Sequence, residues 1–352
     1  MASADVLRLA TYNTELSRKG PGLLLRDISG GKDPQVQAIV AVIVAARPDI
    51  VLLQGIDYDM DGLALAALAD LLRRRDLDYP YLFALPPNTG LRTGLDLDGD
   101  GRTGGPGDAQ GFGYFTGQDG MAILSRYPIE DSAARDFSGL LWVDLPGATL
   151  PRIDGRPFPS AQAQAVQRLS DTGHWDVPVR VGDTVLHLLA FHASPPVFDG
   201  PEDRNGLRNR DELRLWSLYL DGALGGAPPP QAGFVVLGDA NLDPADGDGR
   251  SAAMVDLLAD LRLVDPTPRS GGGVAAAQIQ GGANTVQRGD PALDTADWDD
   301  AGPGNLRVDY VLPSADLAVL GSGVVWPEDG ALADLVATAS RHRLVWLDIA
   351  LP

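Results

Sequence analysis

The sequence predicts a mixed α/β (α+β) fold with two buried β-sheets. Short apolar runs that end in polar residues alternate with segments of helical length, and no linker-like segment divides the chain. Several of these runs are apolar on both faces, as expected of strands that are covered on each side. With 352 residues, 44% of them hydrophobic, the chain is long enough to enclose a large core.

The individual elements follow from periodicity and from the residues that end each run. The predicted strands cover residues 6–12, 49–53, 81–85, 120–128, 185–192, 234–241, 307–313 and 344–351. The predicted helices cover residues 33–47, 61–75, 204–220 and 251–261. Two long segments rich in Gly and Asp, at about 86–119 and 266–306, are predicted to be loop insertions in a single domain of residues 1–352.

Acidic residues dominate the charge of the chain. It has 48 Asp and Glu against 28 Lys and Arg, which gives a formal net charge of −20; only five of the acids are Glu and only two of the bases are Lys. A surface this negative repels phosphate backbones, so we expect no strong non-specific binding of nucleic acid. The absence of Cys excludes disulfides, thiolate nucleophiles and zinc–thiolate sites.

No apolar run reaches transmembrane length, and no signal-peptide core follows the first residues. We therefore expect a soluble chain without a transmembrane segment, and a monomer. The cellular compartment stays open, and a mature secreted or periplasmic form would suit the composition.

Polar side chains gather where the predicted strands end. They are Asn13, Gln54, His192, Asp239 with Asn241, Asp309, and His342. Several strands that each deliver one or two such groups can build a site on rigid elements. Within the Gly-Asp-Ala-Asn run at 238–241, the Asp239 carboxylate and the Asn241 amide leave the strand on the same side. The carboxylate could accept a proton from a water molecule, and the amide could hold that water.

Seven short motifs resemble the endonuclease/exonuclease/phosphatase superfamily, which has a DNase I-like fold. In chain order they are ATYNTE at 10–15, PDIVLLQGID at 48–57, GMAILSRYPI at 120–129, LLAFHAS at 188–194, VVLGDAN at 235–241, RVDYVL at 307–312 and SRHRLVWLDI at 340–349. Each is weak alone, but seven in the family's order make a specific signal. The resemblance implies a four-layer, two-sheet β-sandwich flanked by helices, with the site at one end of the sandwich.

The resemblance also implies roles for the site residues. Asn13 and Asn241 would bind the metal or phosphate and orient the attacking water, and Asp239 would be the base or the water-positioning carboxylate. His342, paired with Asp309, would stabilise the transition state or protonate the leaving group. His192 would contact the scissile phosphate from the other side.

Two positions depart from the family pattern, and both would lie near the expected Mg²⁺ or Mn²⁺. Gly55 replaces the glutamate that ligates the ion, and Arg341 replaces an aspartate. Three hypotheses follow: Asp57 or Asp59 substitutes as a ligand; the Arg341 guanidinium takes the ion's place and grips the phosphate, with Gly55 making room; or the site is inactive. We rank the first two equally and above the third.

A second constellation resembles the first half of a calcium loop. Asp96, Asp98 and Asp100 alternate before Gly101, although Gly107 stands where a bidentate Glu is expected and Asp108 follows it. Ca²⁺ binding and an ordinary Asp/Gly-rich turn are equally compatible with this pattern. Because the segment directly precedes the 120–128 strand, we expect it to line the active site.

Together these features predict a phosphoester hydrolase, of the phosphodiesterase, nuclease or phosphatase type, that acts by in-line attack of water and depends on a divalent metal held in an altered site. The substrate would be a nucleic acid, a lipid head group or a small phosphate ester. The alternatives are a non-catalytic binder of phosphate or other anions and a calcium-stabilised interaction protein on the same fold.

Overall fold

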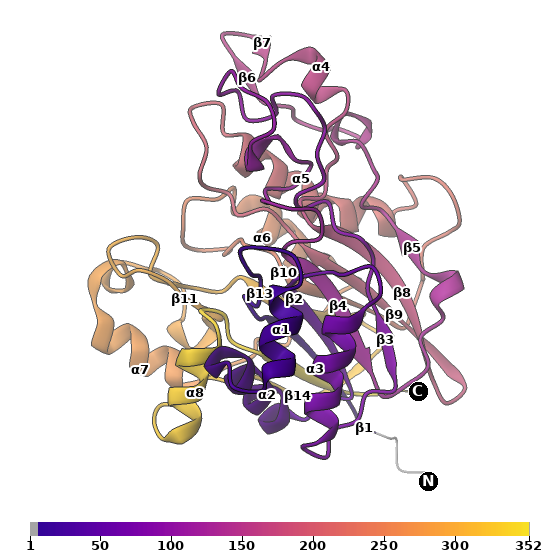
Figure 1. Ribbon diagram of the computed structural model, residues 1–352, viewed down its shortest axis with the longest axis vertical. Helices are drawn as coiled ribbons and strands as arrows, with labels where there is room; N and C mark the ends of the chain where they lie inside the picture. The colour runs from indigo at the N-terminus through magenta and orange to yellow at the C-terminus, as the bar shows by residue number, and fades with distance from the viewer. Residues whose placement is uncertain (1–5, 352) are drawn as a thin grey trace.

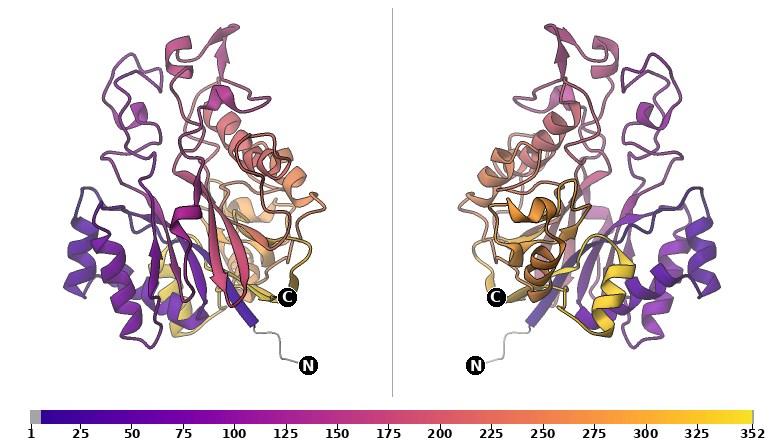
Figure 2. Two further views of the ribbon diagram at one scale, coloured as in Figure 1. Left: turned by 90° about the vertical axis from the view of Figure 1, so that its right-hand side faces the viewer. Right: turned by 90° about the vertical axis from the view of Figure 1, so that its left-hand side faces the viewer.

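Two β-sheets pack face to face and are covered by helices on their outer faces, which confirms the predicted fold class (Figures 1 and 2). The computed structural model describes residues 6–351. Residues 1–5 and 352 of the predicted domain lie outside the described residues. Within residues 6–351, no helix is both long and apolar enough to span a lipid bilayer.

The first sheet has six strands in the order β14-β15-β1-β2-β4-β3. In that order they are Ala318–Val324, Val345–Ala350, Val6–Asn13, Ile50–Ile56, Gly120–Ser125 and Tyr81–Phe83. The central pair β1 and β2 is parallel and the other neighbours are antiparallel. Strand β2 is buried at all of its positions because helices cover one face of the sheet and the second sheet covers the other.

The second sheet has five strands in the order β13-β10-β9-β8-β5. In that order they are Asp309–Pro313, Phe234–Asp239, Thr184–His192, Gly173–Val181 and Arg135–Asp136. Its parallel pair is β9 and β10. Two small hairpins lie outside the sandwich: β6 (Arg152–Ile153) with β7 (Arg156–Pro157), and β11 (Ala296–Asp297) with β12 (Asn305–Leu306).

The helices divide between the two outer faces. In chain order they are α1 (Leu23–Gly30), α2 (Pro34–Ala46), α3 (Leu63–Arg73), α4 (Ala161–Gln164), α5 (Arg204–Leu220), α6 (Ala252–Leu258), α7 (Gly271–Gln280) and α8 (Ala331–Ala339). Helices α1, α2, α3 and α8 bury their apolar residues against the outer face of the first sheet. Helices α5 and α6 do the same on the second sheet, which leaves a third apolar core between the sheets.

The two long insertions differ in structure. Residues 86–119 contain no helix or strand apart from a three-residue 3-10 helix at Pro106–Asp108. Residues 266–306 are not a continuous loop, because α7 forms within them and Ser270 caps its first turn by accepting a hydrogen bond from the Gly273 amide. The three glycines that open α7 are poor helix formers, which is why the sequence indicated a loop there.

Candidate functional site

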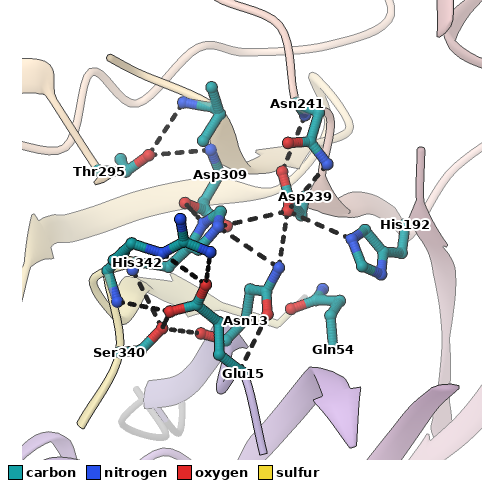
Figure 3. A network of polar contacts seen from close by, with 12 residues as sticks. Asn13, Glu15, Gln54, His192, Asp239, Asn241, Thr295, Asp309, Ser340 and His342 are labelled. Carbon is teal, nitrogen blue, oxygen red and sulfur yellow. Dashed lines mark hydrogen bonds and ion pairs between the residues drawn. The ribbon is translucent and has the colours of Figure 1, made fainter. Parts of the chain in front are cut away.

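The strand register brings the polar strand ends together. In the second sheet, Asp239 of β10 pairs with His192 of β9 on one side and with Asp309 of β13 on the other. In the first sheet, Asn13 of β1 pairs with Gln54 of β2. Because the two sheets pack face to face, these five side chains meet at one end of the sandwich (Figure 3).

Asp239 is the buried centre of this cluster. Its Oδ2 accepts hydrogen bonds from Asn13 Nδ2 at 2.9 Å and Asn241 Nδ2 at 3.2 Å, and it lies 3.4 Å from His192 Nε2. Its Oδ1 accepts from the Asn241 backbone amide at 2.8 Å. Burial by itself raises the pKa of Asp239, but the charges of His342 and His192 outweigh it and hold the pKa below its usual value. Asp239 is therefore ionised at neutral pH.

His342 is held between two carboxylates. Its Nδ1 lies 3.0 Å from Asp309 Oδ2, its Nε2 lies 3.8 Å from Asp239 Oδ2, and the ring stacks edge-to-face on Trp298. Burial lowers the pKa of His342, yet the charges of Asp309 and Asp239 raise it to about 9. Burial raises the pKa of Asp309 to about 6 despite the attraction of His342. At neutral pH the imidazole is thus protonated and its orientation is fixed, which suits donation to a phosphate or a leaving oxygen.

His192 lies on the other side of Asp239. Its Nδ1 is 3.4 Å from Thr172 Oγ1. Burial lowers the pKa of His192, but its bond to Asp239 raises the value to about 9. The backbone around it is anchored by Glu212 of α5, which accepts hydrogen bonds from the amides of Asp171 and Ser194 at 2.7 Å each. His192 is therefore a second oriented cation.

Glu15 is a site residue that the sequence analysis did not identify. Its carboxylate accepts hydrogen bonds from the Arg341 side-chain Nε and backbone amide, at 2.8 Å each, and from Ser340 Oγ at 3.2 Å. The available signal was its place two residues after Asn13 in the first motif, together with the rarity of Glu in this chain. The pairing itself joins residues 326 positions apart, so only the fold reveals it.

The expectation that Gly55 makes room for Arg341 is corrected by the structure. A Cβ at Gly55 would lie 2.5 Å from Asn13 Oδ1 and 2.7 Å from the Glu15 backbone nitrogen. Gly55 also has φ +69, a left-handed conformation that favours glycine. Gly55 thus makes room for the chain at 13–15, while Arg341 is paired with Glu15 and has a side chain 63% exposed.

Asp57 and Asp59 do not reach the cluster as substitute ligands. The Asp57 carboxylate accepts hydrogen bonds from the backbone amides of Arg18 and Asp119. Asp59 accepts from the amides of Leu63 and Ala64 and so caps α3. Both line a different cavity from that of His192 and His342, so neither carboxylate is placed to replace a metal ligand at the cluster.

The donors around the cluster do not fit the usual Mg²⁺ or Mn²⁺ ion. Glu15 is neutralised by Arg341, and Asp239 and Asp309 are neutralised by the two histidines. Asp239, Asp309 and His342 do place ligand atoms within 4.8 Å of one another, but an ion bound by all three would have to displace the proton of the His342 imidazole. In place of a metal ion, Arg341, His192 and His342 supply the positive charge beside these carboxylates.

A cavity of about 690 Å³ opens beside the cluster. Its lining includes Asn13, Glu15, Asn241, Arg341 and both histidines. Five further carboxylates also line it, those of Asp119, Asp243, Asp246, Asp248 and Asp299, and the sequence analysis did not identify Asp119. Asp119 directly precedes β4, where the family motif begins one residue later. Aromatic and apolar side chains form another part of the wall: Phe112, Pro195, Pro196, Val197, Phe198, Leu242, Trp298, Pro303, Leu306 and Val308.

The expected calcium loop has a different composition from the one predicted. Carboxylate oxygens of Asp96, Asp98 and Asp108 lie within 4.8 Å of one another, whereas Asp100 is outside this group and accepts a hydrogen bond from the Arg102 amide. These residues do not line the cavity of His192 and His342. Calcium binding by this loop stays a prediction.

Comparison with known proteins agrees with the fold. The sequence profile of the Endonuclease/Exonuclease/phosphatase family matches residues 10–342. No curated protein matches the chain. Among solved structures, an endonuclease/exonuclease/phosphatase from Beutenbergia cavernae superposes with a TM-score of 0.56 at 20% identity, covering 98% of this chain and 72% of that one.

Two further solved structures have the same fold. Sphingomyelinase C from Streptomyces griseocarneus has a TM-score of 0.50 at 19% identity, covering 98% of this chain and 99% of that one. A Staphylococcus aureus beta toxin mutant with bound magnesium ions has a TM-score of 0.50 at 14% identity, covering 97% of this chain and 99% of that one. At these identities the similarity establishes the fold alone.

Proposed function

Because this chain belongs to the endonuclease/exonuclease/phosphatase family, we propose that it is a phosphoester hydrolase that acts by in-line attack of water on phosphorus. The observation that carries the proposal is the buried Asp239 carboxylate between two oriented, protonated imidazoles, with amides of Asn13 and Asn241 on its oxygens. A carboxylate base and a carboxylate-held imidazole acid are the two groups that hydrolysis of a phosphoester needs.

The proposed step assigns one proton transfer to each side of the phosphorus. Asp239 accepts a proton from the water as the water oxygen bonds to phosphorus, while Asn241 holds that water. As the bond from phosphorus to the leaving oxygen breaks, His342 donates its Nε2 proton to that oxygen, and Asp309 stabilises the imidazole that remains. His192 donates a hydrogen bond to a non-bridging oxygen.

The positive charge at the phosphate is proposed to come from the protein. Members of this family commonly use divalent metals such as Mg²⁺. Here, the carboxylates that would hold the ion form ion pairs with Arg341, His192 and His342. In this proposal His192 and His342 stabilise the phosphoryl oxygens, and Arg341, whose Nε and Nη2 donate to Glu15, adds the charge of its guanidinium and its Nη1 as a donor.

The experiment is hydrolysis of bis(p-nitrophenyl) phosphate by the wild type and by Asp239→Asn. The substitution keeps the shape of the side chain and removes the base, so kcat should fall about 10²–10⁴-fold. Asp334→Asn, the same change at an exposed position of α8, is the matched control and should keep the wild-type rate. Equal rates for wild type and Asp239→Asn would contradict the proposal and favour a non-catalytic anion binder.

A further inference from the structure

Two chain segments flank His192 at the end of the β8–β9 ladder. The antiparallel register of these strands ends with the pair of Gly173 and His192, so the residues before Gly173 and those after His192 leave the ladder at the same end. Thr172 lies in the first segment and places its Oγ1 3.4 Å from His192 Nδ1. Ser194 lies in the second segment and is buried. The position of the imidazole therefore depends on how these two segments are held together.

Glu212 of α5 joins the two segments. One oxygen of its carboxylate, Oε1, accepts a hydrogen bond from the Asp171 amide at 2.7 Å. The other oxygen, Oε2, accepts from the amide and the Oγ of Ser194, at 2.7 Å each. The Glu212 side chain is fully buried. Its hydrogen bonds thus continue the connection between the two segments beyond the last residue pair of the ladder.

A carboxylate suits this position because two backbone donors, one from each segment, face it. A buried backbone N–H without an acceptor costs free energy comparable to a lost hydrogen bond. An ionised carboxylate has two acceptor oxygens and no donor, whereas a Gln amide has one acceptor oxygen and an NH₂ donor. Glu212→Gln would therefore satisfy one of the two backbone amides and leave the other facing a donor.

Arg208 holds the first segment from one turn earlier on α5. Its guanidinium donates to the carbonyl oxygens of Leu169 and Ser170, at 2.7 and 2.9 Å, and to Asp171 Oδ1 at 3.0 Å. Burial raises the pKa of Glu212 to about 7, the charge of Arg208 opposes this rise, and Asp171 adds to it. The cost of burying the ionised carboxylate is offset by its hydrogen bonds to the two segments and by the guanidinium charge.

We infer that Glu212 is a positioning residue for His192, because its carboxylate joins the Asp171 and Ser194 amides and so fixes the segments on either side of the imidazole. The inference rests on the proposed function, in which His192 donates a hydrogen bond to a non-bridging oxygen. Glu212 does not belong to the described residues that line the cavity, so it acts through His192 and not by contact with the substrate. A misplaced donor stabilises the transition state less, so loss of this connection should lower kcat more than it changes KM.

The test compares Glu212→Gln with a matched control, Asp211→Asn. Asp211 is the preceding residue of α5 and is equally buried, but its carboxylate accepts hydrogen bonds from Trp142 Nε1 at 2.8 Å and from the Thr149 amide at 3.0 Å. Neither of these partners belongs to the described lining of the cavity. Each substitution replaces a buried carboxylate by an amide, so both should lower the melting temperature.

The kinetic measurement is hydrolysis of bis(p-nitrophenyl) phosphate at pH 8, where Glu212 is ionised, and at a temperature at which both variants are folded. We expect Glu212→Gln to reduce kcat about tenfold or more while KM stays within about threefold of the wild-type value. Asp211→Asn should keep kcat within about twofold. Wild-type kcat in Glu212→Gln, or an equal loss of kcat in Asp211→Asn, would overturn the inference while leaving hydrolysis intact.

A spectroscopic signature separates positioning of His192 from a general loss of stability. The chain has four His, so few imidazole Hε1 signals need to be assigned by NMR. We expect Glu212→Gln to shift the His192 signal and to leave the His342 signal in place, and Asp211→Asn to shift neither. A fall in kcat without a shift of the His192 signal would also overturn the inference.

Glu212→Asp replaces Glu212→Gln if the latter does not fold. It keeps the charge and both acceptor oxygens but is shorter by one methylene, so a reduced kcat with a shifted His192 signal supports the inference, and wild-type kcat overturns it. An inactive wild type would instead count against the proposed function. The His192 signal then decides alone: a shift in the Glu212 variant that Asp211→Asn does not show supports the positioning role, and an unshifted signal overturns it.

Discussion

Gly55 sets how closely the chain at 13–15 approaches β2. The nearest atoms to its missing side chain are Asn13 Oδ1 and the backbone of Glu15, and φ +69 at Gly55 favours glycine. The loss of a family carboxylate at this position is therefore tied to a tight local packing. A glutamate cannot be restored there without moving residues of the site.

Gly55→Ala tests this packing. We expect it to destabilise the protein by about 1–3 kcal/mol, because the new Cβ clashes and the left-handed conformation is strained. Urea unfolding measures the change. Gly139→Ala is the control, since a Cβ there meets no atom within 4 Å. Equal stability of Gly55→Ala and Gly139→Ala would contradict the packing argument.

At the scale of elements, the sequence predicts helices and strands whose apolar pattern is continuous and ends at polar residues. It does not predict strands whose apolar pattern is broken by polar residues, Pro or Gly. Helix α5 has the predicted bounds, Arg204–Leu220. Strand β8 was missed because Asp176 and Pro178 interrupt its apolar pattern, and β14 because glycines dilute it. Both strands are fixed by neighbours far away in sequence rather than by local preference.

Part of the candidate site could likewise be predicted from the sequence, and part depends on long-range packing. Asn13, Asp239 and Asp309 stand at strand ends, so the sequence could predict that they gather, and the register places Asp309 beside Asp239. The Glu15–Arg341 pair and the direction of the Asp119 side chain depend on how the two sheets and their loops pack. Sequence periodicity carries no information on either.

The aspartates of the 86–119 insertion lead to a separate prediction about Ca²⁺ binding. If Asp96, Asp98 and Asp108 bind Ca²⁺, added Ca²⁺ raises the melting temperature of the wild type, since the ion binds only the folded loop. Asp98→Asn should abolish this rise, whereas Asp100→Asn should keep it because Asp100 lies outside the group. Differential scanning calorimetry with Ca²⁺ and with EDTA makes the measurement. The same rise in wild type and Asp98→Asn would exclude this loop as the site.

For the whole molecule, the net charge of −20 is a property of the surface rather than of the buried cluster around Asp239. In that cluster each carboxylate has a cationic partner: Glu15 pairs with Arg341, Asp239 with His192, and Asp309 with His342. The pKa shifts of buried groups, inside this cluster and outside it, nevertheless make stability depend on pH. The pKa of buried Asp294 is raised to about 8 and that of Glu212 to about 7, by burial in each case, and those of His192 and His342 are raised to about 9.

Each of these groups binds its proton more tightly in the folded protein than in the unfolded chain. The stability that this proton contributes is therefore present below the unfolded pKa and is lost as the pH rises through the folded pKa. We expect the melting temperature to fall between about pH 6 and pH 9, measured in high salt that screens the net charge. Asp294→Asn should reduce the fall, because Asp294 Oδ2 is buried and has no hydrogen-bond partner among the described residues. A melting temperature that rises over this range would contradict the prediction.

The central claim is that the buried cluster hydrolyses phosphoesters with cations that the protein itself supplies. The most direct measurement is the rate of bis(p-nitrophenyl) phosphate hydrolysis by the wild-type protein in excess EDTA, compared with the rate in Mg²⁺. The account predicts that the rate in EDTA stays within about threefold of that in Mg²⁺, because Arg341, His192 and His342 already match the carboxylates of the site. A loss of hydrolysis in EDTA that Mg²⁺ restores would contradict it.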